Sequence, residues 1–254
     1  MRITFTIAAL AATLVLATVA TAQSGRSTLR SRGEAPELRN NVFFNTETPL
    51  RLENLRGSVV LLEFWTFDCI NCIRTIPHVQ QWHETYAADG LVVIGDHYPE
   101  FSYERDPANV EAAINRLGIT YPVAQDNARL TWGAYNQRYW PTMYLIGKNG
   151  NIRYMHIGEG KYAQTEAAIQ TLLAEPFTPQ AAPDGTVTEV RKYIRATEPL
   201  NVRTGPGINH GRVATISTEL VMVVLGEQNG WYEIEYDGKP GHYVSGEYVT
   251  VGEW

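Results

Sequence analysis

The chain of 254 residues contains two cysteines, and they lie very close together. Cys69 and Cys72 form a C-x-x-C pair within the stretch FWTFDCINCIRTIP, residues 64–77. A disulfide that closes so short a loop removes little chain entropy, because this effect grows with loop length. A tetrahedral zinc site would need two further ligands, and the six histidines show no spacing that supplies them. The pair therefore predicts thiol–disulfide chemistry, and we expect no metal.

The residues after Cys69 have the periodicity of an amphipathic helix, which we expect over residues 69–88. Its apolar face comprises Ile76, Val79, Trp82, His83 and Tyr86. Cys69 then lies in the first turn, where unpaired N–H groups and the macrodipole favour an anion and lower a thiol pKa. We expect Cys69 to be the attacking thiolate and Cys72, one turn further along, to resolve the mixed disulfide.

Asp68 directly precedes Cys69. Aspartate is among the best helix N-caps, so we expect Asp68 to cap this helix. Its charge would also disfavour the Cys69 thiolate, which makes the couple a poorer oxidant. Ile70 and Asn71 carry no charge that would offset this effect. The local chemistry therefore favours a reductant.

The segments around the dithiol alternate between strand and helix patterns. Two continuous apolar runs suit strands inside a largely parallel sheet, and an Asp-Pro pair opens a helix that a glycine ends. A Gly-containing turn between two strand patterns indicates a hairpin. In chain order we expect a strand at 58–65, the dithiol helix, a strand at 91–96, a helix from Asp106-Pro107 to Gly118, a hairpin at 142–158 and a helix at 161–173.

This order, with the C-x-x-C where a strand gives way to a helix, resembles the thioredoxin fold. The stretch EFWTFDCINC resembles the thioredoxin active-site strand and turn, while GLVVIGDHYPEF and YWPTMYLI resemble the TlpA and DipZ-like branch of secreted thioredoxin-like proteins. The resemblance covers most of residues 36–175. It implies an α/β fold, with a central mixed sheet flanked by helices, and a secreted thiol–disulfide oxidoreductase.

The resemblance also implies roles for three further residues. Glu63, within the strand LLEFW, takes the place of a buried carboxylate beneath the dithiol. Desolvation would raise its pKa and let it accept the Cys72 proton, whereas a solvent-facing Glu63 is the alternative. Pro141 takes the place of the family's cis-proline, which would expose the Trp140 backbone to an extended substrate. The Trp140 side chain could bind substrate or simply pack.

Two other functions fit parts of the sequence. Thr66 and Cys69 supply the T-x-x-C half of the peroxiredoxin pattern P-x-x-x-T-x-x-C, but Leu62 stands where the proline should be. An acid beside a peroxide-reactive thiolate would also be unfavourable. The other alternative is an envelope-binding module whose dithiol is vestigial.

A second domain is expected at residues 188–254, after a proline-rich linker at 176–187 that suits neither a helix interior nor a central strand. Glycine turns separate its short strands, and residues 199–254 resemble a small all-β bacterial SH3-like (SH3b) barrel. Such domains often bind cell-wall peptides or protein ligands, although a barrel that only spaces or dimerises the enzyme is the alternative. The groove candidates are Tyr193, Trp231, Tyr232 and Tyr243.

The N-terminus indicates export. Arg2, an apolar run and Ala20-Thr21-Ala22 have the form of a signal peptide over residues 1–22, followed by a flexible leader at 23–35. We expect a periplasmic or other cell-envelope location, soluble after cleavage, where Cys69 and Cys72 readily form a disulfide. The expected partners are envelope protein thiols and disulfides and an unidentified redox partner.

The formal net charge of −6 comes without a basic stripe, so we expect no nucleic-acid partner. We expect no cofactor.

Overall fold

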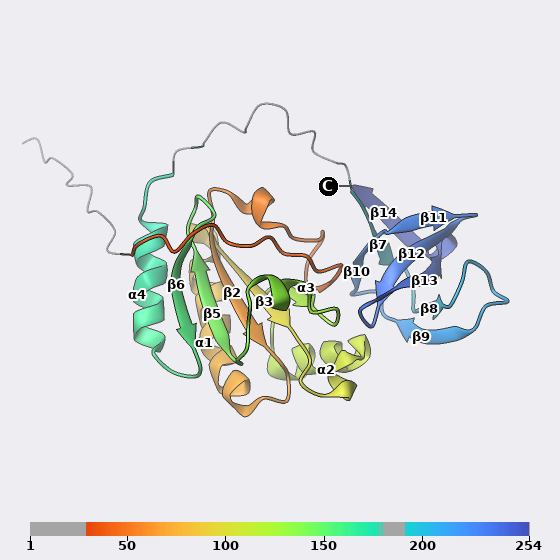
Figure 1. Ribbon diagram of the computed structural model, residues 1–254, viewed down its shortest axis with the longest axis horizontal. Helices are drawn as coiled ribbons and strands as arrows, with labels where there is room; N and C mark the ends of the chain where they lie inside the picture. Colours follow the sequence, from red (N-terminus) through yellow and green to blue (C-terminus); the bar gives the residue numbers. More distant parts are fainter. Residues whose placement is uncertain (1–28, 178, 180–190, 254) are drawn as a thin grey trace, which may run out of the picture.

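The computed structural model describes residues 29–177, 179 and 191–253 (Figure 1). The expected signal peptide lies outside the described residues, as do much of the leader and most of the linker at 176–187. Among the described residues, no helix is both long and apolar enough to cross a membrane.

The N-terminal part of the described chain, residues 29–177, carries the dithiol and is called the redox part below. It alternates strands and helices as expected. The dithiol strand, helix and following strand are β2 (Val59–Trp65), α1 (Ile70–Tyr86) and β3 (Leu91–His97), with β1 (Val42–Phe44) before them. The later elements are α2 (Pro107–Leu117), β4 (Val123–Gln125), α3 (Leu130–Ala134), β5 (Thr142–Ile146), β6 (Ile152–Ile157) and α4 (Tyr162–Leu173). Short 3₁₀ turns are η1 (Leu52–Leu55), η2 (Ala87–Asp89) and η3 (Ser102–Arg105).

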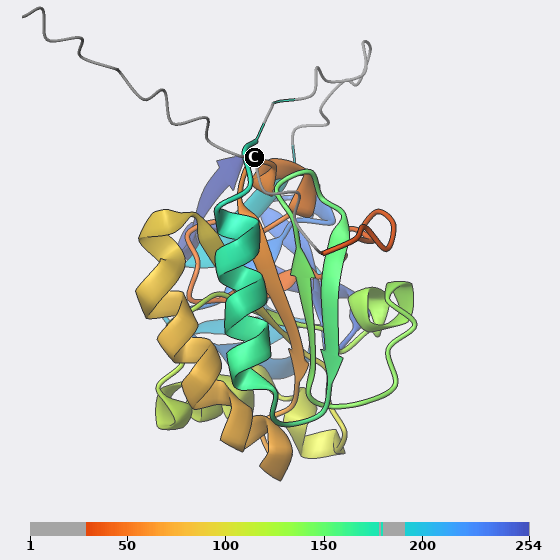
Figure 2. The same cartoon turned by 90° about the vertical axis from the view of Figure 1, so that its left-hand side faces the viewer.

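Strand β2 lies inside the sheet and is buried at all seven of its residues. It runs parallel to β3 and antiparallel to β5, and β3 runs parallel to β4, so the sheet is mixed. Successive β2 side chains point to opposite faces, and they enter two separate apolar clusters. Buried residues of α1, α2 and α4 share one cluster, and α1 and α4 lie side by side over that face (Figure 2).

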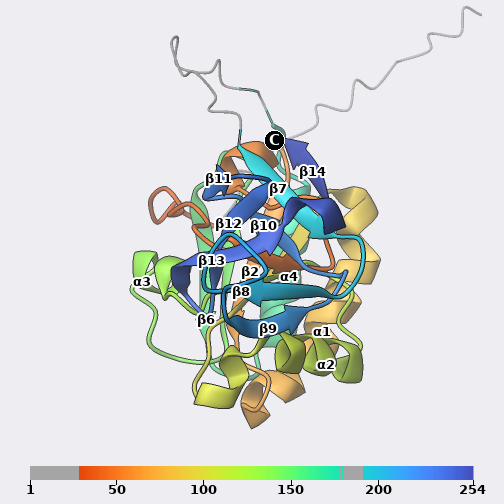
Figure 3. The ribbon, with the colours of Figure 1, turned by 90° about the vertical axis from the view of Figure 1, so that its right-hand side faces the viewer.

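The C-terminal, SH3-like part, residues 191–253, consists of strands and one 3₁₀ turn. They are β7 (Lys192–Ala196), β8 (Leu200–Arg203), β9 (Arg212–Ile216), β10 (Val221–Val223), β11 (Gly226–Gln228), β12 (Trp231–Tyr236), β13 (Lys239–Ser245), η4 (Gly246–Tyr248) and β14 (Val249–Glu253). Five of these strands form a sheet of their own, in the order β11-β12-β13-β8-β9. Figure 3 looks onto these strands.

The two parts share a sheet, which the division of the sequence into two domains did not predict. Strand β10 pairs antiparallel with β1, and β7 and β14 continue outward, so the order is β14-β7-β10-β1-β4-β3-β2-β5-β6. Val42 of β1 lies opposite Met222 of β10, and both are buried. Because buried backbone groups need hydrogen-bond partners, the short strand β1 is paired on both of its edges. The SH3-like part is therefore fixed to the redox part.

Candidate dithiol site

Cys69 and Cys72 are placed differently at the start of α1. Cys69 is the N-cap residue and is partly exposed, whereas Cys72 is fully buried. Both are free thiols, which is the reduced state of the pair. A hydrogen bond from the Cys72 thiol, with further help from the backbone N–H groups of Cys72 and Asn71, lowers the Cys69 pKa to about 6. Burial, followed by its hydrogen bond to Cys69, raises the pKa of Cys72. The site therefore pairs one reactive thiolate with one protected thiol.

The expectation that Asp68 caps α1 is wrong. Cys69 occupies the N-cap position, and the helix has no side-chain cap. The exposed Asp68 carboxylate instead accepts a hydrogen bond from the Tyr103 hydroxyl, which raises the pKa of Tyr103 to about 12. The acidic group that raises the Cys69 pKa is Glu100, and its effect is smaller than that of the hydrogen bonds. The Asp68 carboxylate thus binds Tyr103 and not the helix N-terminus.

Glu63 is fully buried on β2, so its side chain does not face solvent. Desolvation, with a smaller contribution from the Cys69 charge, raises its pKa to about 8, although the hydrogen bond from Tyr121 acts in the opposite direction. The Tyr121 hydroxyl donates to its Oε2 atom at 3.4 Å, while its Oε1 atom has no hydrogen-bond partner among the described residues. Glu63 in turn contributes to the raised pKa of Cys72. Its protonation and that of the dithiol are therefore coupled.

A second buried carboxylate, Glu104, is absent from the sequence-based site. It lies in η3 and accepts hydrogen bonds from Thr66 Oγ1 at 2.6 Å and from the Asp68 backbone N–H at 3.2 Å. The backbone N–H groups of Glu100 and Phe101 donate to its other oxygen, at 2.7 and 2.8 Å. Glu104 thus ties the segment before α2 to the loop that carries Cys69. Its position three residues after Phe101, in the spacing of a capping glutamate, was the available signal.

A buried histidine packs against the loop that precedes Cys69. His97 ends β3 and stacks on Phe67, with ring centroids 5.5 Å apart. Its Nε2 atom lies 3.4 Å from Thr66 Oγ1. Burial lowers the pKa of His97 to about 3, so the ring is neutral at physiological pH. His97 therefore shapes this loop without adding charge.

The Trp140–Pro141 peptide bond is cis. The Trp140 ring packs against Trp132, with centroids 4.6 Å apart, and lies nearly parallel to Tyr98 at 5.9 Å. This three-ring stack favours packing over substrate binding for the Trp140 side chain. The neighbouring Tyr139 and the Ile70 side chain at the start of α1 are exposed, at 58% and 57%.

The SH3-like part contains a groove of about 730 Å³, and of the four groove candidates only Trp231 lines it. Tyr232 does not line the groove because it is the neighbour of Trp231 on β12, and successive side chains of a strand point to opposite faces. Tyr232 packs against the large core, and Tyr193 packs against the small buried cluster around Phe43. The groove residues that the sequence did not indicate include Glu198, Ile208, Glu247 and Tyr248.

The described residues hold no group of three or more His, Cys, Asp or Glu side chains arranged to bind a metal ion. What they do hold is a reactive cysteine at a helix N-terminus, a buried partner thiol and a cis-proline segment on a mixed α/β sheet. Fold and site together define a dithiol protein of the thioredoxin type.

Comparisons with known proteins agree with this class. A family model described as AhpC/TSA family matches residues 33–155, and one described as bacterial SH3 domain matches residues 198–250. Protein DipZ of Mycobacterium tuberculosis (strain CDC 1551 / Oshkosh) is 44% identical over 169 residues, which are 65% of this chain and 24% of DipZ. The chain thus spans about a quarter of the length of that relative.

Two further relatives match over most of their own length. Thiol-disulfide oxidoreductase ResA of Geobacillus kaustophilus (strain HTA426) is 31% identical over 122 residues, which are 48% of this chain and 67% of ResA. The solved structure of a thiol-disulfide isomerase from Corynebacterium glutamicum is 29% identical, with a TM-score of 0.51, covering 56% of this chain and 98% of that one. The chain belongs to the thioredoxin-like thiol–disulfide oxidoreductases and carries a bacterial SH3 domain. Both family resemblances seen in the sequence are confirmed.

Proposed function

We propose that this oxidoreductase is exported and reduces disulfides of cell-envelope proteins. The observation that carries the proposal is the contrast between the two thiols. Cys69 is partly exposed and has a pKa of about 6, so most of it is thiolate at neutral pH. Cys72 is buried and protonated until a substrate occupies Cys69. Attack therefore begins at Cys69 alone.

In the first step, the Cys69 thiolate attacks one sulfur of the substrate disulfide, and the other substrate sulfur leaves as a thiolate. In the second step, Cys72 loses its proton and attacks Cys69 Sγ, which releases the second substrate sulfur and forms the Cys69–Cys72 disulfide. Two electrons pass to the substrate, and an external dithiol returns them to the enzyme.

Glu63 is the acceptor that we propose for the Cys72 proton. The negative charge on Cys69 raises the Glu63 pKa, and mixed-disulfide formation removes that charge. The Glu63 pKa therefore falls when the mixed disulfide forms, so Glu63 releases its own proton to water and its carboxylate can then accept the Cys72 proton. This change in charge lets one buried carboxyl group act in sequence with the dithiol.

The reductant direction is supported by the Cys69 pKa. A stabilised thiolate favours the reduced enzyme, and nucleophile pKa values near 7 in thioredoxin and near 3.5 in DsbA accompany potentials of about −270 and about −120 mV. The Cys69 pKa of about 6 is closer to the thioredoxin value. Such a couple gives electrons more readily than DsbA does.

The SH3 groove supplies the second half of the proposal, a binding site for an amine-bearing peptide of the envelope. Trp231 and Tyr248 line the groove together with the carboxylates of Glu198 and Glu247. Arg203 also lines the groove, and its guanidinium donates to the carbonyl oxygens of Ile208 and His210. Aromatic faces and carboxylates together suit a cationic group. We expect Trp231→Ala to abolish co-sedimentation with cell wall, which Tyr193→Ala would preserve.

Trapping tests the exchange reaction in the cell. The Cys72→Ala protein should accumulate as mixed disulfides with envelope proteins, visible after non-reducing electrophoresis. The Cys69→Ala protein, which lacks the nucleophile, should form none. An absence of adducts in both variants would contradict exchange with envelope proteins. Export is tested separately by the mass of the mature protein, which should begin at Gln23.

The match of the AhpC/TSA family model to residues 33–155 is an observation that favours a second candidate function, peroxide reduction. The dithiol arrangement opposes it, since the Cys69 sulfur already receives a hydrogen bond from Cys72. Hydrogen peroxide consumption with thioredoxin-type recycling separates the two functions. Rapid consumption that survives Cys72→Ala would favour the peroxidase.

A further inference from the structure

Segment η3 lies between the dithiol loop and the SH3 domain and contacts both. Its residue Glu104 is hydrogen-bonded to the loop before Cys69, as described above, and the next residue is Arg105. Arg105 Nε donates to Asp237 Oδ1 at 2.6 Å, and one of its terminal nitrogens donates to Asp237 O at 3.3 Å. Asp237 lies in the turn between β12 and β13. Two consecutive residues of η3 therefore face the two functional parts of the protein.

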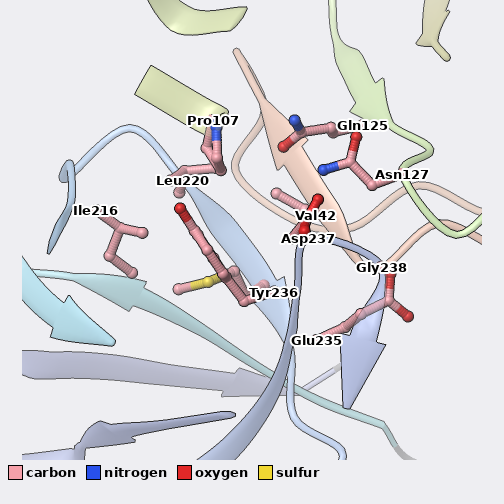
Figure 4. A pocket seen from close by; sticks show the side chains of 11 residues that line it. Val42, Pro107, Gln125, Asn127, Ile216, Leu220, Glu235, Tyr236, Asp237 and Gly238 are labelled. Atoms are coloured by element: carbon pink, nitrogen blue, oxygen red, sulfur yellow. The ribbon is translucent and has the colours of Figure 1, made fainter. Parts of the chain in front are cut away.

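The β12–β13 turn fits closely against the redox part. Asp237 and Gly238 both have positive φ angles, 52° and 70°. A Cβ atom on Gly238 would lie 2.8 Å from the Asn127 carbonyl carbon and 2.8 Å from the Ala128 nitrogen, so no side chain fits there. Figure 4 shows the small pocket between the two parts, which Asp237 and Gly238 line from the SH3 domain and Gln125 and Asn127 line from the redox part. The turn is seated on backbone atoms, which cannot yield as a flexible side chain would.

Another turn of the SH3 domain offers a direct contrast. Asn229 and Gly230, between β11 and β12, have nearly the same positive φ angles, 52° and 77°. A Cβ atom on Gly230 would meet no atom within 4 Å. The two turns share their backbone geometry, and only the β12–β13 turn is pressed against the redox part.

Arg105 also forms hydrogen bonds with residues of the redox part. The side-chain amides of Gln125 and Asn127 donate to the Arg105 carbonyl oxygen at 2.9 and 2.7 Å. The Arg105 guanidinium also donates to the Asn127 carbonyl at 3.0 Å. Arg105 is thus fixed at its carbonyl by strand β4 and the residues after it, and at its side chain by the SH3 turn.

We propose that the β12–β13 turn of the SH3 domain positions the dithiol loop, with Arg105, Asp237 and Gly238 as positioning residues. The contacts run from the turn to Arg105, from there to Glu104, and from Glu104 to Thr66 and the Asp68 N–H. The ion pair is about one-third exposed on both sides, so its effect on stability is small. Its role is geometric, because the Cys69 sulfur depends on aligned donors from Cys72 and Asn71.

Two variants separate geometry from charge. Gly238→Ala lifts the turn without changing any charge, and Asp237→Asn breaks the ion pair while keeping a residue that tolerates positive φ. Loss of alignment should raise the Cys69 pKa in both proteins. Removal of the Asp237 charge alone would act in the opposite direction, since fewer nearby anions favour a thiolate. A rise in Asp237→Asn is therefore diagnostic of positioning.

The measurement is the rate of Cys69 alkylation by iodoacetamide against pH, in the reduced full-length protein, with peptide mass identifying the modified thiol. We expect the midpoint to rise by about half a pKa unit, which lowers the thiolate fraction at pH 6 by about twofold. The reduction potential in a glutathione series should fall accordingly. Neither readout requires a substrate protein or a ligand of the SH3 groove.

Matched controls are available for both changes. Gly230→Ala places a similar backbone strain in a turn where the added Cβ atom meets no atom within 4 Å. Glu47→Gln breaks another ion pair between the two parts, Arg195–Glu47 at 3.4 Å. Both controls should keep the wild-type midpoint. The proposal is overturned if Asp237→Asn keeps that midpoint too, or if the controls shift as far as the test variants. If Gly238→Ala does not fold, Asp237→Asn decides alone.

Discussion

Replacing Glu63 by glutamine should slow the enzyme and stabilise it at high pH. Burial raises the pKa of Glu63 from its usual 4.5 to about 8, so between these values the folded protein keeps a proton that the unfolded chain releases. The stability associated with protonated Glu63 is complete below pH 4.5 and is lost as the pH rises through 8. Glutamine cannot ionise and escapes this loss.

The size of the effect follows from the pKa. At ~1.4 kcal/mol per unit, a rise from 4.5 to about 8 corresponds to a swing of about 5 kcal/mol in the free energy of unfolding. The glutamine oxygen still accepts the Tyr121 hydroxyl, while its buried NH₂ group costs about 1–3 kcal/mol at every pH. The difference between Glu63→Gln and wild type should therefore increase from about pH 4 to about pH 9 and then level off.

Urea unfolding across this pH range measures the difference, with both proteins in the disulfide form so that thiols do not titrate. The swing is then smaller than in the reduced protein, because the Cys69 charge no longer raises the Glu63 pKa and desolvation alone does so. Glu84→Gln, on the exposed side of α1, is the control and should show no such trend. In separate kinetics, resolution of a mixed disulfide with a model peptide should slow on the order of 10²-fold in Glu63→Gln. A stability difference that is constant with pH would refute the raised pKa. Unchanged resolution kinetics would show that another group takes the Cys72 proton.

Two more predictions concern the loop and the core. Asp68→Asn should leave the Cys69 alkylation midpoint near pH 6, because the hydrogen bonds from Cys72 and Asn71 lower the Cys69 pKa most. A fall of the midpoint by about one unit or more would show that the Asp68 charge raises the Cys69 pKa. Phe64→Ala should lower the free energy of unfolding by about 3–5 kcal/mol, because Phe64 is fully buried and packs edge-on against Trp132 and Tyr144. A loss below about 1 kcal/mol in urea unfolding would show that the cavity collapses.

The sequence predicted the elements whose signal is local. Strand β2 is a continuous apolar run, and all seven of its residues are buried. Helix α2 begins as expected, with Asp106 as N-cap accepting from the Ala108 N–H at 3.0 Å and with Pro107 in the first turn. These features depend on neighbouring residues only, so their pattern is complete within a short window.

The features that the sequence did not predict depend on contacts between distant residues. Glu104 meets Thr66 across 38 positions, and no spacing rule links a carboxylate in one loop to a hydroxyl in another. Strand β1 pairs with β10 from the opposite end of the chain, although β1 is only three residues long. The position of Asp68 next to the helix predicts a cap, because aspartate is a favoured N-cap residue. The competing donor, Tyr103, comes from η3, which folds back onto the loop.

Glu63 and Glu104 show how one site uses two buried carboxylates in different ways. Both are fully buried near the dithiol loop. Glu104 accepts four hydrogen bonds, three of them from backbone N–H groups, so moving it would leave several buried donors without partners. Glu63 accepts a single long hydrogen bond and has an oxygen without a partner among the described residues. A carboxylate with four donors holds backbone in place, while one with few donors can change its protonation as nearby charge changes. The difference in hydrogen bonding, rather than in burial, therefore separates the anchor of the loop from the proton acceptor of the reaction.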